Sequence, residues 1–121
     1  MRLLDANILR YFERAGLLDH LLALPRIGLT SSVRRELARW RGLRERVDYA
    51  LESGALVLCD MDPADEQEGT LYFLYRERDG FGDGEATSMA VACRRGLTFV
   101  THDLVPAAKI RRLACIIHER S

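Results

Sequence analysis

The sequence has few of the features that mark secreted, membrane-spanning or zinc-binding proteins. Its three cysteines are widely spaced and lie among apolar residues, so neither a disulfide framework nor a C-x-x-C zinc site is predicted. The N-terminal stretch MRLLDANILR carries an acid within its first five residues, and the chain has no uncharged apolar run long enough for a signal peptide or a membrane span. We therefore expect a soluble, cytoplasmic protein without a membrane partner.

Lysine is almost absent, since Lys109 is the only one, and the net charge is zero. The overall balance therefore does not indicate nucleic acid as a partner. The segment VRRELARWRGLRERV nevertheless concentrates arginine, at Arg34, Arg35, Arg39, Arg41, Arg44 and Arg46. Arginine suits phosphate recognition, but a solvated helical face explains the same pattern. Both interpretations stay open.

The pattern of the chain predicts a single α/β domain. The 121 residues suffice for one domain, 1–121, and no repeat, linker or low-complexity stretch divides them. Short apolar runs alternate with helical patterns, which is typical of a parallel sheet flanked by helices. The predicted strands are Arg2–Leu4, Ile27–Leu29, Ala55–Cys59, Thr98–Thr101 and Ala114–His118.

Helical spacing of apolar residues predicts the intervening helices. The first covers Ile8–Leu22. The second starts at the caps Thr30 to Ser32, bends near Gly42 and ends at Gly54. The others run from the pair Asp62 and Pro63 to Asp79 and Gly80, from about Asp83 to Arg95 with Gly96 as the C-cap, and onward from Pro106.

Four acids occupy positions from which they could share one site. Asp5 and Asp103 each follow a predicted strand, and in open parallel sheets ligands bind beyond the carboxyl ends of strands. Glu36 and Glu85 flank the apolar stripes of their helices. Each acid also has a local explanation, as a helix cap or, for Glu36, as an ion-pair partner of nearby arginines. If they converge, their repulsion requires a cation, and an all-carboxylate site favours Mg²⁺ or Mn²⁺.

The stretch FGDGEATSMA places two acids at the start of a predicted helix. Asp83 is a good N-cap residue, and Glu85 lies in the first turn, where the helix dipole favours anions. Either acid could instead be a metal ligand. Spacing alone does not decide between these roles.

Four motifs occur in order along the chain: LLDANIL, SSVRREL, GDGEATSMAVA and FVTHD. Together they resemble the PIN domain, and the resemblance spans nearly the whole chain. That family of metal-dependent ribonucleases includes the VapC toxins of VapBC toxin–antitoxin pairs. The resemblance implies a five-stranded parallel sheet in the order 3-2-1-4-5. It also matches Asp5, Glu36 and Asp103 to the first, second and fourth family acids. Asn7 matches a polar position that orients the first acid, and Thr101 matches the usual hydroxyl.

The third family acid is the point of departure. Family members more often carry Asp followed by Ala at this helix start, whereas here Glu85 precedes Ala86 and Asp83 lies two residues earlier. We favour Glu85 as the third acid, because it matches members written G-x-G-E-A. Asp83 is then expected to cap the helix or to add a ligand.

The resemblance implies hydrolysis of RNA phosphodiester bonds by a water bound to Mg²⁺ or Mn²⁺. The arginines expected to position the RNA are Arg34, Arg35, Arg39, Arg41 and Arg44. Many family members pair with a small antitoxin that packs on the early helices. A surplus of leucine at Leu17, Leu18, Leu21 and Leu24 would suit such a contact or a homodimer.

Three other interpretations compete with the ribonuclease. The first is a haloacid dehalogenase phosphatase, which needs a second Asp where this chain has Asn7. The second is a receiver domain, which needs paired acids after the first strand and a Lys after the last, and this chain lacks both features. The third alternative is a non-catalytic PIN-like scaffold that binds RNA or a protein. Its acids need not bind metal, so stabilisation by Mn²⁺ would discriminate against it.

Overall fold

The computed structural model describes residues 1–101, and these form a parallel sheet flanked by helices, as predicted. The strands are β1 (Arg2–Leu4), β2 (Ile27–Leu29), β3 (Val57–Leu58) and β4 (Thr98–Val100). In order β3-β2-β1-β4, every neighbouring pair is parallel. The predicted fifth strand, 114–118, and the helix after Pro106 lie outside the described residues.

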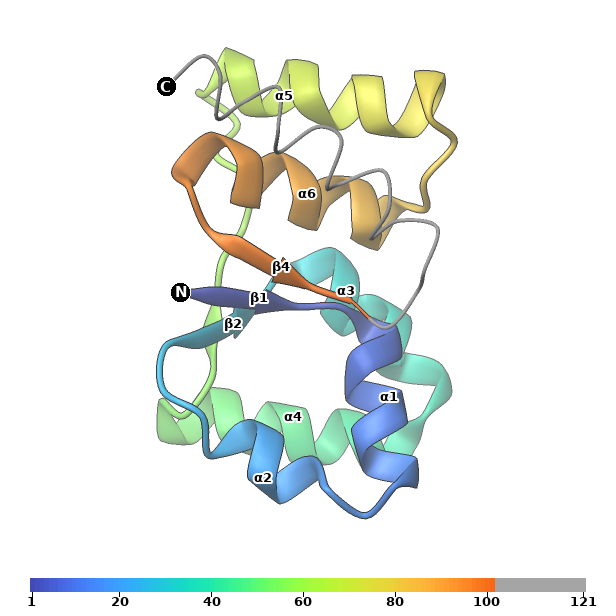
Figure 1. Cartoon of the computed structure of the whole chain (residues 1–121), viewed down its shortest axis with the longest axis vertical. Helices are drawn as coiled ribbons and strands as arrows, with labels where there is room; N and C mark the ends of the chain where they lie inside the picture. The colour runs from blue at the N-terminus through green and yellow to red at the C-terminus, as the bar shows by residue number, and fades with distance from the viewer. Residues whose placement is uncertain (102–121) are drawn as a thin grey trace.

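The helices are arranged on both sides of this sheet. They are α1 (Ala6–Arg14), α2 (Leu18–Leu22), α3 (Ser31–Glu36), α4 (Arg41–Ser53), α5 (Glu66–Phe73) and α6 (Asp83–Arg95). A 3₁₀ turn, η1 (Leu37–Arg39), follows α3, and a π-helical turn, η2 (Leu74–Arg78), extends α5. Figure 1 shows α1, α2 and α4 on one side of the sheet and α5 and α6 on the other.

Apolar side chains from both faces of the sheet form the core. Successive strand residues point to opposite faces. Leu4 accordingly joins a cluster with Leu9 and Val47 of α1 and α4, whereas Leu3 packs with Val91 of α6. A strand buried on both faces is apolar throughout, which explains why short apolar runs located β1 and β2 residue for residue. Strand β3, whose two residues are exposed, is shorter than the predicted run 55–59.

Three helix boundaries differ from the prediction. The expected helix 8–22 is two helices, because the chain turns at Gly16, whose φ of 74° is in the left-handed region. The bend expected near Gly42 lies earlier, at η1 and Trp40. Helix α5 starts after Asp65 rather than at Asp62, since Asp65 Oδ1 accepts hydrogen bonds from the amides of the first turn.

Other predicted ends are confirmed. Gly54 and Gly96 end α4 and α6 in left-handed conformations, with φ of 82° and 69°. Within residues 1–101, none of the helices combines the length and apolar character needed to cross a membrane.

Candidate functional site

The carboxyl ends of β1 and β4 meet where the strand order of the sheet reverses. Strand β1 has β2 on one side and β4 on the other, so this edge is a topological switch point. Asp5 follows β1 and is 1% exposed; its backbone amide donates to Val100 O of β4. Thr101, directly after β4, donates from Oγ1 to Asp5 Oδ2 at 2.9 Å, and the Ala6 amide donates to Oδ1 at 2.8 Å. Asp5 is therefore both the N-cap of α1, one of its predicted roles, and a buried, oriented carboxylate at the switch point.

Glu36, the last residue of α3, brings a second carboxylate to the same edge. Its Oε1 accepts a hydrogen bond from the Gly84 amide of α6 at 3.0 Å. Burial raises the pKa of Glu36, and the negative charges of Asp5 and Asp83 raise it further, while the Gly84 amide and Arg39 act in the opposite direction. The carboxylates of Asp5 and Asp83 are thus each close enough to repel that of Glu36.

Asp83 is not the N-cap of α6, contrary to that prediction. Gly82 occupies the cap position, and Asp83 is the first helical residue. The Asp83 carboxylate accepts from Ser32 Oγ at 2.6 Å and from the Tyr72 hydroxyl, and Arg35 lies 3.7 Å away. These donors lower the pKa of Asp83, with Ser32 as the largest cause. Tertiary partners on α3 and α5, which are invisible in the local sequence, hold this side chain away from the cap.

Glu85 lies in the first turn of α6 and is partly exposed. Residues two positions apart on a helix differ by about 200° in direction, so Glu85 and Asp83 project to different sides of α6. The structure brings Asp83 into electrostatic contact with Glu36.

Of the remaining predicted site residues, Asn7 and Thr101 lie within the described part of the chain. Asn7 is exposed on α1, two residues beyond Asp5. Thr101 is in the predicted place, bonded to Asp5. Asp103 lies outside the described residues.

The donor chemistry of this edge fits a hard divalent cation. The charged side chains that meet there include the carboxylates of Asp5, Glu36 and Asp83, which suit Mg²⁺ or Mn²⁺, and the repulsion on Glu36 is the property that a cation relieves. Among residues 1–101, no three acids, histidines or cysteines are grouped closely enough to hold an ion as they stand.

Most arginines of the 34–46 segment form ion pairs with acids of the same surface. Arg34 and Arg44 contact Asp48, Arg41 contacts Glu45, Arg46 contacts Asp19, and Arg35 reaches Asp83. Arg39 instead lies over the ring of Trp40, with its guanidinium carbon 4.6 Å from the ring centroid. An ion-paired helical face therefore describes much of this segment.

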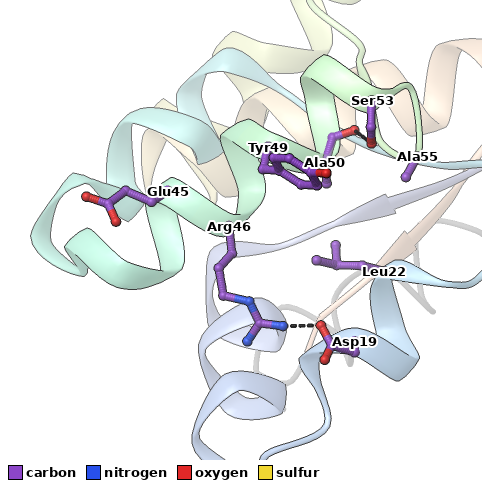
Figure 2. Close-up of a pocket in the computed structure, with 8 residues that line it drawn as sticks. All are labelled: Asp19, Leu22, Glu45, Arg46, Tyr49, Ala50, Ser53 and Ala55. Carbon is purple, nitrogen blue, oxygen red and sulfur yellow. Dashed lines mark hydrogen bonds and ion pairs between the residues drawn. The ribbon is translucent and has the colours of Figure 1, made fainter.

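A pocket of about 370 Å³ lies between α2 and α4, and none of the acids of the switch point lines it. Figure 2 shows Arg46 and Asp19 pointing toward each other across it, with Tyr49 and Leu22 on its walls. The nearby leucines are split: Leu18 and Leu21 are buried in the core, whereas Leu17 and Leu24 are 43% and 42% exposed. Two of the four leucines thus serve the fold.

Sequence reasoning missed three residues that shape the site. Gly84 supplies the amide for Glu36, and a Cβ at this position would lie 2.2 Å from Glu36 Oε1. Ser32 and Tyr72 hold Asp83. The glycine between two acids in GDGE was a usable signal for Gly84, but nothing local marks Ser32 or Tyr72 as partners of Asp83.

No family model matches the chain, and neither the curated proteins nor the solved structures contain a significant match to it.

Proposed function

We propose that this chain is a metal-dependent endoribonuclease of the PIN type. One observation carries the proposal: Asp5 and Glu36 come together at the β1–β4 switch point, and the pKa of Glu36 is raised in part by the charges of Asp5 and Asp83. Carboxylates that repel one another at the ligand-binding edge of a parallel sheet are expected to hold a cation.

In the proposed mechanism, Asp5, Glu36, Asp103 and a third acid from α6 hold Mg²⁺ or Mn²⁺. The bound ion would lower the pKa of a water molecule and polarise the phosphodiester. Thr101 and the Ala6 amide keep the Asp5 carboxylate oriented, and the Gly84 amide does the same for Glu36. Their role is to fix ligand geometry before RNA arrives.

The finer features of the family belong to the same proposal. Residues 114–118 would add a fifth strand beside β4, giving the order 3-2-1-4-5. The chain would be the toxin of a VapBC-type pair, with a small antitoxin or a second copy covering the exposed Leu17 and Leu24. A strictly monomeric chain that binds no product of a neighbouring short reading frame would contradict this part alone.

The test is cleavage of structured and unstructured RNA in Mn²⁺, Mg²⁺ or EDTA, with Asp5→Asn and Asp103→Asn beside the wild type. Asn is also a good N-cap residue, so Asp5→Asn removes the charge while α1 keeps its cap. Asp19→Asn, an exposed acid remote from the switch point, is the matched control. We expect ion-dependent cutting that survives Asp19→Asn and disappears in the other two variants.

A non-catalytic scaffold is the second candidate, and one observation favours it. Both oxygens of Asp83 already accept hydrogen bonds from the protein, as expected of a structural acid. A metal site predicts that Mn²⁺ at about one hundred times its dissociation constant stabilises the fold by about 2.7 kcal/mol. If the folded protein is not stabilised by Mn²⁺ and does not cleave RNA, the result supports the scaffold instead.

A further inference from the structure

Two guanidinium groups from different elements lie over the indole of Trp40. Arg39, at the end of η1, places its guanidinium carbon 4.6 Å from the ring centroid, and Arg10 of α1 places its own at 5.2 Å. Trp40 is half-buried and packs against the main core cluster. A ring fixed in this way holds both cations by cation–π attraction.

Arg39 differs from its neighbours in the arginine-rich segment. Within residues 1–101, no carboxylate lies at ion-pair distance from its guanidinium, and the side chain is exposed. Arg10, by contrast, is paired with Glu13. The Nε of Arg39 donates to the carbonyl oxygen of Glu36 at 3.3 Å. Among the described residues, the segment therefore presents one oriented cation, Arg39, that has no carboxylate at ion-pair distance.

This cation lies beside the carboxylates of the switch point. Arg39 is close enough to the Glu36 carboxylate to lower its pKa. A cluster of acids repels an RNA backbone, so a guanidinium near the cluster that no carboxylate neutralises by an ion pair offers a place for a phosphate. The planar fork of a guanidinium also matches two phosphate oxygens.

We propose that Arg39, oriented by Trp40, binds an RNA phosphate that flanks the scissile one. Arg10, which contacts the same ring, adds positive charge nearby. The ligand is single-stranded RNA, because an exposed guanidinium plane also stacks with unpaired bases. This assignment rests on the proposed ribonuclease function, because the RNA bound at Arg39 would be the substrate on which the acids of the switch point act.

The chain offers a direct probe of this subsite. Trp40 is its only tryptophan, so quenching of fluorescence excited selectively in tryptophan, at a wavelength that the tyrosines do not absorb, reports on this ring alone. The probe ligand is a short single-stranded RNA, titrated in EDTA so that no metal-dependent cutting occurs. The subsite consists of protein side chains, and binding there should persist without metal.

The variants compared are Arg39→Gln, Arg39→Lys and Arg94→Gln. Arg94 lies in the last turn of α6 and pairs with Asp65, so its loss removes the same charge from another surface. Losing one phosphate contact lowers the salt slope by about 0.7 and weakens binding about eightfold at about 0.05 M salt. We expect this for Arg39→Gln and not for Arg94→Gln, whereas Arg39→Lys should keep the salt slope but quench Trp40 less.

The outcomes separate the subsite from the nuclease. RNA that binds Arg39→Gln as tightly as wild type, or that leaves wild-type Trp40 fluorescence unchanged, overturns the subsite even if Mn²⁺-dependent cutting is observed. Arg39-dependent binding without cutting in any metal supports the subsite and overturns the nuclease. Circular dichroism of each variant confirms that the fold is intact.

Discussion

Replacing Gly84 with alanine should remove the second carboxylate from the site while the fold survives. A Cβ on Gly84 would lie 2.2 Å from Oε1 and 2.9 Å from Cδ of Glu36. Neither approach is sterically possible. The atoms that must yield belong to the end of a flexible side chain, so Glu36 swings away and the backbone of α6 stays in place.

The expected change in stability is small because opposing effects nearly cancel. The variant loses a hydrogen bond from the Gly84 amide to a charged group, a loss of about 1.5–3 kcal/mol. Alanine in place of glycine in a helix stabilises the fold by about 0.5–1 kcal/mol. The Glu36 carboxylate also regains water and moves away from the repelling charges of Asp5 and Asp83. We expect a net change within about 1 kcal/mol.

The expected loss of activity is much larger. A misplacement of about 1 Å in a catalytic arrangement can lower the rate about 100-fold, and the displaced Glu36 moves at least that far. RNA cleavage and Mn²⁺ titration measure this effect. The pKa of Glu36, followed by NMR, should fall back toward its ordinary value and gives a readout that does not depend on the proposed function.

Two other glycines provide matched controls. At Gly69 of α5, an added Cβ meets nothing within 4 Å, so Gly69→Ala isolates the gain in helix propensity. At Gly82, one residue before α6, the nearest contact is an ordinary 3.9 Å to Glu85. Both variants should keep cleavage and Mn²⁺ binding. A Gly84→Ala protein that retains the raised pKa of Glu36 and wild-type Mn²⁺ affinity would refute the reasoning.

Two further variants test the electrostatics. Glu36→Gln should stabilise the metal-free protein at neutral pH by about 1 kcal/mol, which raises the Tm by a few degrees. The same variant should abolish the stabilisation by Mn²⁺. Because the folded-state pKa of Glu36 is raised, its charge destabilises the fold increasingly as pH rises above the ordinary value of 4.5. In thermal melts below that pH, Glu36→Gln should therefore have the same Tm as the wild type. Arg95→Met should cost about 3–5 kcal/mol in urea unfolding, because Glu68 is 1% exposed and loses its ion pair at 2.9 Å. The double variant Arg95→Met with Glu68→Leu should recover most of that loss, and failure to recover would contradict an unpaired charge as the cause.

The arrangement of strands and helices could be predicted because burial on both faces leaves a strong local signal. The runs at β1 and β2 match the observed strands residue for residue, and α6 spans the predicted 83–95. Single turn residues were harder to interpret. Gly16 splits one expected helix into two, and Asp65 rather than Asp62 starts α5. The apolar stripe continues across Gly16, so periodicity alone misses that break. Asp62 and Asp65 are both good N-cap residues, and the hydrogen bonds that Asp65 accepts decide between them.

The site could be predicted only in part, because its contacts are distant in sequence. Asp5 and Thr101 each follow a strand, and the parallel order brings them together 96 positions apart. The contact between Glu36 and Gly84 joins two helices across 48 positions and depends on a missing Cβ. No pattern within either helix encodes that contact.

The choice between Asp83 and Glu85 as the third acid follows from the same electrostatics. A metal ligand in a metal-free site suffers repulsion, as Glu36 does, whereas the pKa of Asp83 is lowered by donors from Ser32 and Tyr72. Asp83 therefore behaves as a structural acid, and we expect Glu85 to be the ligand. Asp83→Asn should cost about 1 kcal/mol after solvent screening at neutral pH and keep its Mn²⁺ affinity.

The pH dependence of that cost follows from the direction of the shift. Because the folded-state pKa of Asp83 is lowered, its stabilising charge is present above the ordinary value of 3.8 and is lost as pH falls through the folded-state value. Urea unfolding should therefore show the cost of Asp83→Asn at neutral pH and not in acid. Glu85→Gln should instead have little effect on the stability of the metal-free protein and should abolish its stabilisation by Mn²⁺. If Asp83→Asn instead abolishes the Mn²⁺ response without lowering metal-free stability, Asp83 is the ligand, and its contacts with Ser32 and Tyr72 orient it for the metal.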